Sequence, residues 1–515
     1  MSKTLVIAPP PTPNGDLHVG HMAGPYLAGD IYARYLRLIG ERVNYATGTD
    51  DSQTYVVTSA CKLGTSPENL CRQAADDIRQ SLNDWGVALD GYAQFDDGYK
   101  KMVYAFLSPL YEQGKFRLKT VRLPYSTLRN TFMVESFVSG ECPICLAQSR
   151  GGLCENCGHP NNFDGLKNPV ATLPPYESLE CRETKILVFP LEEYRAELER
   201  YYSAKKGIWR PHILQLMTEL FSRELIDFPI TYPITWGLPS HFPGTEGQVI
   251  NAWAEGMPAS MYCNACGEND TAPTDATWRA ETGNRLAYFL GFDNSYFWGV
   301  THLALLMAHE GKYLLPDTIV PNEFYELENA KFSTSRGHLI WARDLVKTLP
   351  RDYARFYLCL TSPEHNRNNF SRDALSQILN ERLIDAWNAL VRAYTTQRWE
   401  LRLNDDEGNT PLLVDTMNQR LTLTCRLETF SQSRLADWCL HHIGRLQELV
   451  AGESDISLKA INQQLRVLVD GLGLIMIDLH HAIVNTNPLN GSEQWVLPEL
   501  SPITTFFTKS GSHAS

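Results

Sequence analysis

The chain of 515 residues contains no long run of uncharged apolar residues and has no excess of basic charge. Without such a run we expect no membrane-spanning helix, and without a charged-then-apolar start we expect no secretion leader. These absences favour a cytoplasmic protein that does not contact a membrane. The formal net charge of −13 argues against a global basic field for nucleic acid, so any RNA would be bound by local basic patches.

A disulfide framework is also absent, although the chain has 12 cysteines. Six are scattered, and two form an isolated CxxC, Cys263 and Cys266, which we interpret as structural or redox-silent. The remaining four form two CxxC pairs separated by eight residues, a spacing that favours tetrahedral zinc over a secreted disulfide pattern. The alternative is four reduced cysteines without a metal. The predicted ligands of a structural zinc ion are Cys142, Cys145, Cys154 and Cys157.

Two to four domains are expected, because 515 residues exceed what one compact core holds. Strand-like and helix-like segments alternate over residues 1–114, which predicts an α/β fold with a parallel sheet. The turn-rich residues 115–230 interrupt this alternation and carry the paired cysteines, so we interpret them as an insertion. The alternation resumes over residues 231–325, a loop and linker follow at 326–375, and long helical stretches predict an all-helical domain over 376–515.

The segment PPPTPNGDLHVGH, residues 9–21, joins the first predicted strand to a helix, at the place where α/β sheets bind ligands. Asp16 is placed to cap this helix. His18 and His21 are three residues apart and therefore share one face of its first turn. Gly20 leaves room for a flat group, and unpaired backbone N–H groups beside two imidazoles favour a phosphate. The alternative is a pair of surface histidines at a helix start.

A second segment, KFSTSRG at residues 331–337, lies far along the chain after the second half of the predicted sheet. A lysine, three hydroxyl groups and an arginine on a loop that ends in glycine suit a mobile clamp on a polyphosphate. Taken alone, this segment is equally consistent with an ordinary solvated loop.

Together the two segments resemble the paired signatures of class I aminoacyl-tRNA synthetases, which are a His-Ile-Gly-His motif and a Lys-Met-Ser-Lys-Ser loop. Over residues 3–375 the chain is most similar to the methionyl-tRNA synthetase family. Its segments GTDDSQ, NAWAEGMP and GFDNSYFW match that family's GTDEHG, VWLDAP and GKDIVYFH, in the same order. The resemblance implies a Rossmann-type catalytic domain in two halves, a connective insertion with a zinc knuckle, and a helical domain like the anticodon-binding domains.

The resemblance also implies a role for each matching residue. Catalysis would use His18, His21, Lys331, Ser333 and Ser335. ATP, bound with Mg²⁺, would contact Asn14, Gly20, Gly291, Asp293 and Thr334. The amino acid would contact Pro10, Thr12, Asp50, Trp253 and Trp298, with Asp50 holding its ammonium group. Asn388 and Arg392 fall roughly where the family reads its anticodon, and the alternative for this pair is a solvated helix face.

The family's reaction needs no protein nucleophile. The amino acid's carboxylate attacks the α-phosphate of ATP to give an aminoacyl adenylate, and a ribose hydroxyl at the 3′ end of tRNA then attacks the activated carbonyl. Catalysis would come from positioning the reactants and stabilising charge on the displaced phosphates. The resemblance therefore implies an aminoacyl-tRNA ligase of protein biosynthesis, with ATP, an amino acid and tRNA as partners.

Several positions depart from the family's pattern. Thr334 replaces the second lysine of the loop, which predicts slower activation. Thr12 stands where the family has a tyrosine, Trp298 where it has a histidine, and EGM where it has DAP, so the preferred amino acid can differ. We find no counterpart of the family's anticodon-reading tryptophan, which makes the anticodon contacts doubtful.

Three interpretations follow, and the sequence leaves the oligomeric state and the true amino acid open. The first is a divergent methionyl-tRNA synthetase. The second is a paralogue that uses a different amino acid or acceptor in a specialised biosynthetic pathway. The third is a non-catalytic RNA-binding relative, against which the joint presence of His18, His21, Asp50, Lys331 and Asp293 argues.

Overall fold

The computed structural model describes most of the chain as two compact units. The described residues are 2–205, 207–267, 274–331, 338–399, 410–452, 456–487 and 493–504, with only the backbone of Lys331. The first unit comprises Met1–Leu17, Glu41–Ser81 and Ala88–Asn322, and the second comprises His18–Gly40, Leu82–Val87 and Glu323–Ser515. Of the predicted loop, Ser333, Thr334 and Ser335 lie outside the described residues. Among the residues described, no helix is both long and apolar enough to cross a membrane.

A five-stranded parallel sheet forms the centre of the first unit and confirms the predicted α/β architecture. Its order is β16–β15–β1–β2–β3, and β1 is buried along its whole length because helices cover both faces of such a sheet. The strands are β1 (Thr4–Ile7), β2 (Val43–Gly48), β3 (Gly91–Ala93), β15 (Arg285–Gly291) and β16 (Thr318–Asn322).

The helices of the first unit pack around two apolar clusters, a large one and a small one that contains Val56, Ala60, Leu70 and Cys71. They are α3 (Thr54–Leu63), α4 (Pro67–Asp84), α5 (Asp97–Glu112), α6 (Arg195–Ser203), α7 (Pro211–Phe221), α8 (Ala252–Cys266) and α9 (His302–Ala308). Helix α8 contacts β2 and β3 closely, because a Cβ atom on Gly48 would lie 2.8 Å from the Cys263 sulfur. One on Gly91 would lie 2.0 Å from the Cys263 carbonyl oxygen. Cys263 is therefore a packing residue.

The insertion is built from short antiparallel sheets that the sequence did not reveal. A long ribbon pairs β4 with β11 and carries β5 and β12 at its edges, and β10–β6–β7 form a second sheet. The strands are β4 (Arg117–Ser126), β5 (Thr131–Phe132), β6 (Val138–Glu141), β7 (Gln148–Arg150), β8 (Gly152–Leu153), β9 (Pro160–Asn161), β10 (Lys167–Ala171), β11 (Glu180–Phe189) and β12 (Phe228–Pro229). The four cysteines lie at the turns around β7 and β8.

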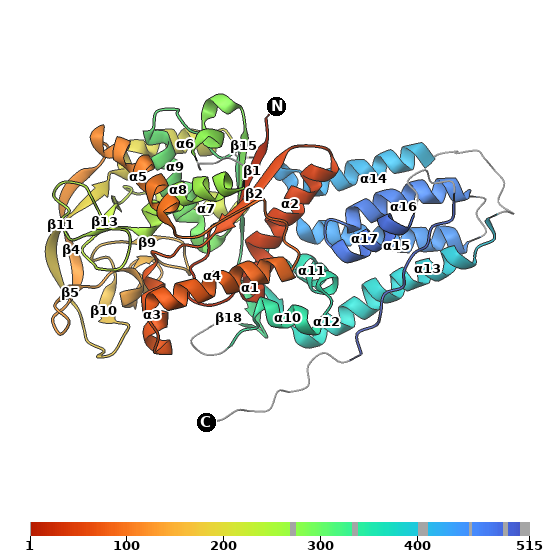
Figure 1. Cartoon of the computed structure of the whole chain (residues 1–515), viewed down its shortest axis with the longest axis horizontal. Coiled ribbons are helices and arrows are strands. Elements are labelled where there is room, and N and C mark those ends of the chain that lie inside the picture. The colour runs from red at the N-terminus through yellow and green to blue at the C-terminus, as the bar shows by residue number, and fades with distance from the viewer. Residues whose placement is uncertain are drawn as a thin grey trace, which may run out of the picture. The chain divides into compact units, whose positions relative to one another are not determined.

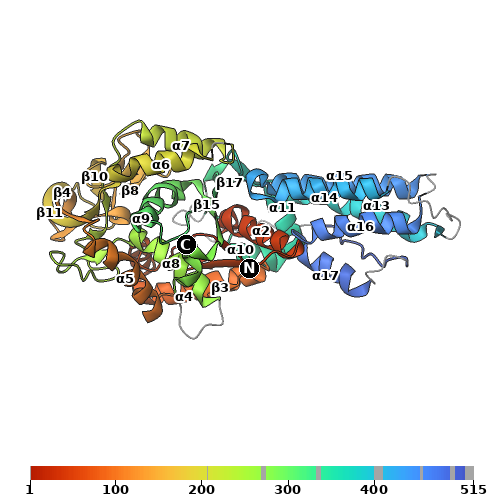
Figure 2. The same cartoon turned by 90° about the horizontal axis from the view of Figure 1, so that it is seen from above.

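The second unit is mostly helical, as predicted for the C-terminal part of the chain. Figures 1 and 2 show α13, α14, α15 and α16 running alongside one another. Its helices are α2 (Leu27–Leu38), α10 (Ala342–Thr348), α11 (Arg351–Leu360), α12 (Arg372–Ile378), α13 (Asp385–Thr396), α14 (Thr410–Cys425), α15 (Gln432–Ala451), α16 (Leu458–Leu472) and α17 (Ile477–Thr486). A small sheet contains β17 (Tyr325–Leu327), β18 (Ala330–Lys331) and β19 (Asn368–Phe370).

A buried ion pair joins distant segments inside this second unit. The Arg355 guanidinium lies 2.7 Å from the Asp30 carboxylate, and both side chains are fully buried. Asp30 also accepts from Arg34, and Arg355 donates to the carbonyl oxygens of Leu474 and Ile475. The pair therefore ties α2 and α11 to the turn that precedes α17.

Candidate functional site

The two histidines of the first motif form the turn that opens α1 (Val19–His21) in the second unit. The His18 Nδ1 accepts from the Gly20 N–H at 3.1 Å, and the His21 Nδ1 accepts from the His18 N–H at 3.2 Å. Their rings stack with centroids 3.8 Å apart. His18 is thus the capping residue, and the prediction that Asp16 caps this helix is wrong because the helix begins two residues later than expected.

This arrangement fixes the tautomer of both imidazoles. Because each Nδ1 accepts a backbone hydrogen bond, the ring hydrogen of a neutral histidine must lie on Nε2. Burial lowers the pKa of His21 to about 4 and holds the pKa of His18 well below its usual value. Near neutral pH the pair therefore offers two uncharged Nε2–H donors.

The chain that follows the predicted loop pairs with this histidine turn. The Val19 N–H donates to the Ile340 carbonyl oxygen at 3.0 Å, and His18 and Trp341 form an antiparallel bridge. On the other side of the loop, Lys331 pairs with Glu326 across β17 and β18. The segment after the loop is thus anchored beside the histidines within the second unit, and the loop's own residues 332–337 lie outside the described part of the chain.

Asp50 lies in the first unit, just beyond the carboxyl end of β2. Its backbone N–H donates to the Pro11 carbonyl oxygen at 3.0 Å, which places it beside the segment that carries Pro10 and Thr12. The Gln53 side chain donates to its Oδ2 at 2.8 Å. Burial raises the pKa of Asp50 to about 7, so a cationic ligand beside this residue would stabilise its ionised carboxylate.

The aromatic residues predicted for the amino acid lie on two neighbouring segments. Trp253, capped through its N–H by Asn251, stacks on Phe297 with centroids 3.7 Å apart and planes 8° from parallel. Trp298 is buried and makes edge contacts with Tyr288 and with His302, at 5.1 and 4.9 Å between centroids.

His302 is a residue that sequence reasoning missed. Its Nε2 lies 2.5 Å from the Trp253 carbonyl oxygen, to which it donates, so its Nδ1 is a buried acceptor without a partner in the described structure. A Cβ atom on Gly256 would lie 2.6 Å from the imidazole, so this glycine makes room for the ring. The spacing of four residues from Trp298, together with the glycine, was the available signal.

Gly291 and Asp293 mark the carboxyl end of β15, where parallel sheets bind ligands. The Asp293 carboxylate folds back over Gly291, and a Cβ atom there would lie 2.6 Å from its Oδ1. The Asn294 amide donates to the same oxygen at 3.2 Å. Only glycine at position 291 leaves this carboxylate its observed position.

A second buried carboxyl group, also missed from the sequence, belongs to Glu255 on α8. Its Oε2 accepts from the hydroxyl groups of Ser52 at 2.9 Å and Tyr99 at 3.0 Å. Burial, reinforced by the nearby Asp50 carboxylate, holds the pKa of Glu255 well above its usual value. Burial likewise raises the pKa of Glu135 to about 8.

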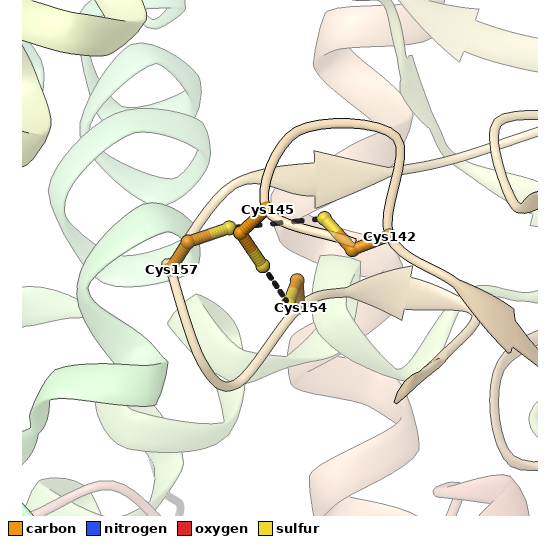
Figure 3. A group of neighbouring side chains, drawn as sticks. All are labelled: Cys142, Cys145, Cys154 and Cys157. Atoms are coloured by element: carbon orange, nitrogen blue, oxygen red, sulfur yellow. Dashed lines mark hydrogen bonds between the residues drawn. The ribbon is translucent and has the colours of Figure 1, made fainter. Parts of the chain in front are cut away.

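The four predicted zinc ligands converge, as Figure 3 shows. All four sulfur atoms lie within 4.8 Å of one another, with Cys142 and Cys157 at 3.8 Å and Cys145 and Cys154 at 3.7 Å. Tetrahedral zinc with Zn–S bonds of about 2.3 Å separates its sulfur atoms by about 3.8 Å, so the spacing fits that metal. The Asn156 amide donates to the Cys145 sulfur at 3.6 Å, as expected around a metal-bound thiolate.

The predicted tRNA contacts, Asn388 and Arg392, lie on α13 of the second unit. The Asn388 side chain is buried, accepts from the Leu500 N–H at 2.7 Å and donates to the Leu500 carbonyl oxygen at 2.8 Å. Its amide therefore holds the C-terminal segment against α13. Arg392 is exposed and lies 3.6 Å from the Glu499 carboxylate.

Comparisons with known proteins show which family and which fold the chain is similar to. A family model described as "tRNA synthetases class I (M)" matches residues 4–394. A methionine–tRNA ligase of Bacteroides fragilis is 29% identical over 394 residues, and one of Salinibacter ruber is 31% identical over 413. Both alignments cover 76% of this chain and 57% of the relative, so the chain spans little more than half the length of these proteins.

Two solved structures have a similar fold. Both are Mycobacterium tuberculosis methionyl-tRNA synthetase in complex with methionyl-adenylate. They superpose with TM-scores of 0.73 and 0.74 at 19% and 17% identity, covering 98% of this chain and all of theirs.

Proposed function

Because this chain belongs to the family of class I tRNA synthetases (M), we propose that it activates an amino acid with ATP and transfers it to the 3′ end of tRNA. We propose methionine as the amino acid, since the curated relatives are methionine–tRNA ligases. The observation that carries the proposal is the histidine turn, in which mutual capping holds two neutral imidazoles in the tautomer with the ring hydrogen on Nε2.

In the first step the amino acid's carboxylate attacks the α-phosphorus of ATP, and pyrophosphate leaves. His18 and His21 would donate hydrogen bonds to phosphate oxygens that gain negative charge, and Lys331 would add a positive charge from the loop. Gly20 and Asn14 would line the nucleotide, and Asp293 would bind the ribose beside Gly291. Mg²⁺ would accompany ATP, with Ser333, Thr334 and Ser335 on the clamp.

In the second step a ribose hydroxyl of the tRNA attacks the carbonyl of the adenylate, and AMP leaves. Asp50 would hold the ammonium group in both steps, with Pro10, Thr12, Trp253 and Trp298 around the rest of the amino acid. Of the two residues predicted to contact tRNA, Arg392 has an exposed cationic side chain that would bind a phosphate of the RNA.

The cysteine cluster would bind a structural zinc ion. Its four thiolates fill a tetrahedral shell completely, so the metal would cross-link the insertion and leave no position for a substrate. The protein brings the four sulfur atoms together on two turns, and the Asn156 amide donates a hydrogen bond to the Cys145 sulfur.

Amino-acid-dependent exchange of pyrophosphate into ATP, measured with each of the twenty amino acids, tests the proposal. Exchange with methionine supports the proposal. Exchange with a different amino acid, and none with methionine, would show that this other amino acid is the substrate. Absence of exchange with all twenty would overturn an activating function. Acylation of total tRNA with the active amino acid then tests the acceptor, and a failure at that step would overturn the tRNA part alone.

A further inference from the structure

Three buried side-chain oxygens in the first unit have no hydrogen-bond partner among the described residues. They are Asp50 Oδ1, Gln53 Oε1 and Glu255 Oε1. The side chains of Gln53 and Glu255 are almost completely buried. Leaving a buried acceptor unpaired costs about 1–3 kcal/mol, so three such atoms on residues that are linked to one another indicate a missing donor.

One direct hydrogen bond and one through a neighbouring residue of the chain link the three groups. The Gln53 amide donates through Nε2 to Asp50 Oδ2, which leaves its own Oε1 beside that carboxylate without a donor. Ser52, which lies between these two residues in the chain, donates to Glu255 Oε2. The Asp50 charge also contributes to the raised pKa of Glu255, although the two carboxyl groups share no hydrogen bond. Each of these three linked groups therefore keeps one buried acceptor without a donor.

Neither a metal nor a cation of the chain accounts for the vacant acceptors. In the described part of the chain, the cysteine cluster is the group of side chains that lie close enough together to bind a metal ion. The groups that shift the pKa of Asp50 are its own burial, Gln53 and Asp51, with no lysine or arginine among them. An ammonium group has three N–H donors, which matches the three acceptors in number, and its positive charge would favour the ionised form of Glu255, in which Oε1 is an acceptor.

We propose that Glu255 is a specificity-determining residue that, together with Gln53, completes the binding of the substrate's α-ammonium group by Asp50. This inference rests on the proposed function, since the ammonium belongs to the amino acid that is activated. Ser52 and Tyr99 hold the Glu255 carboxyl group by its other oxygen, so the vacant oxygen keeps a fixed direction.

The consequence is strong selection against α-hydroxy acids. A site built from buried acceptors rejects an analogue that lacks the N–H donors, because those acceptors then remain unpaired. The corresponding α-hydroxy acid presents one O–H donor and no positive charge, so it satisfies at most one of the three oxygens.

The variant Glu255→Gln tests this directly. Two hydroxyl donors face Oε2, so the new amide keeps its oxygen there and turns its NH₂ group toward the ammonium. We expect kcat/KM for the active amino acid, methionine on our proposal, to fall about 10- to 100-fold in pyrophosphate exchange. We expect the value for its α-hydroxy analogue to change less than threefold, so the ratio of the two falls at least several-fold.

Asp51→Asn is the matched control. Asp51 is the neighbouring carboxyl group and accepts from Thr49 at 2.6 Å, and neither of its oxygens is among the buried unpaired atoms. This variant should keep the wild-type ratio. Gln53→Met gives an independent variant, which removes the third acceptor without adding a donor and should lower the ratio by a smaller factor.

The outcomes separate the two proposals. If wild-type protein exchanges pyrophosphate but the folded Glu255→Gln and Gln53→Met variants both keep its ratio of amino acid to hydroxy acid, the role of Glu255 is wrong and the proposed function stands. If Asp51→Asn lowers the ratio as much as Glu255→Gln, the effect is one of general charge and the proposal also falls. No exchange by wild-type protein would overturn the proposed function itself.

Discussion

At the scale of single residues, the histidine motif could be predicted from its spacing, but the use of its nitrogen atoms could not. The sequence places His18 and His21 on one face of a helix. The structure adds that each Nδ1 caps a backbone N–H, which places the ring hydrogen on Nε2. Side-chain capping by histidine depends on where the helix begins, and that boundary is set by the bond from Val19 to Ile340, far along the chain.

Substitution of His21 can separate these two uses of the ring. Asparagine places an oxygen near the position of Nδ1, so His21→Asn should keep the cap and lose the Nε2–H donor. We expect the rate of pyrophosphate exchange to fall about 100-fold, as for loss of one donor to a developing charge, with little change in the thermal midpoint. Glutamine reaches the position of Nε2, and His21→Gln should therefore retain more activity. Equal rates for wild type and His21→Asn would contradict this role.

The Asp50 carboxyl group should make stability depend on pH. Burial raises its pKa from 3.8 to about 7, so between these values the folded state holds a proton that the unfolded state has released. The contribution of Asp50 to the free energy of unfolding is therefore complete below about pH 4. As the pH rises through 7 the free energy of unfolding falls, by on the order of 4 kcal/mol.

Denaturant unfolding at pH 5, 6, 7 and 8 checks this dependence against Asp50→Asn, which cannot ionise. The wild-type midpoint should fall relative to that of the variant as the pH rises, and saturating amino acid should reduce the difference. Curves that run parallel over this range would show that Asp50 is not the group involved.

Glu255 and His302 were missed for a common reason. Each makes its decisive contacts with distant segments: Glu255 with Ser52 and Tyr99, and His302 with the backbone of Trp253 and with Gly256, which has no side chain. A position-by-position comparison with the family's motif aligns Trp298 with the family's histidine and does not consider His302. In the fold, His302 lies one helical turn further along and its ring contacts that of Trp298.

At the scale of secondary-structure elements, the parallel sheet was predictable because its strands are buried on both faces and appear as short apolar runs. The strands of the insertion were not. Residues 117–120 at the start of β4 are all exposed, so no alternation of apolar and polar side chains marks the strand. Its pairing with β11 joins Val121 to Thr184, and such distant partners cannot be inferred from local pattern.

The metal centre should stabilise the elements around it. Gly158, next to Cys157, has a left-handed φ of 73°, and a Cβ atom there would lie 3.0 Å from Leu216 on α7 and 3.4 Å from Phe292. Fixing Cys157 on a metal therefore also fixes this contact. We expect one zinc per chain by elemental analysis, and we expect its removal by a chelator to lower the thermal midpoint by several degrees.

Cys145→Ser should reproduce the effect of the chelator, and Cys61→Ser, at an exposed cysteine outside the cluster, should not. Full stability of the zinc-free protein would contradict a structural role for the metal.

At the scale of the whole molecule, the sequence suggested domains that follow one another along the chain, whereas the compact units draw on separated segments. The second unit includes residues 18–40 together with residues after 322. Propensity and periodicity are local, so they predicted the helices of this unit but not that α2 packs with them. The contact is held by charge: Asp30 on α2 pairs with Arg355 on α11.

Breaking that pair tests how far the unit depends on its first segment. Arg355→Met removes the buried guanidinium that pairs with Asp30 and should lower the free energy of unfolding by about 3–5 kcal/mol, measured by urea denaturation. The double variant Asp30→Leu with Arg355→Met should recover part of this loss, because it also removes the buried carboxylate. The recovery should be incomplete, because Arg34 then loses its partner on Asp30. A single variant as stable as wild type would show that the pair contributes nothing.

The interleaving of the two units constrains how the protein can be made. A ribosome delivers α2 among the first 40 residues, yet the helices that share its unit emerge only after residue 322. The nascent α2 must therefore wait, with its apolar side chains uncovered, until about two thirds of synthesis is complete. Cutting the gene at residue 322 would consequently leave the first unit whole on one fragment, whereas the other fragment would lack residues 18–40 and 82–87 of the second unit.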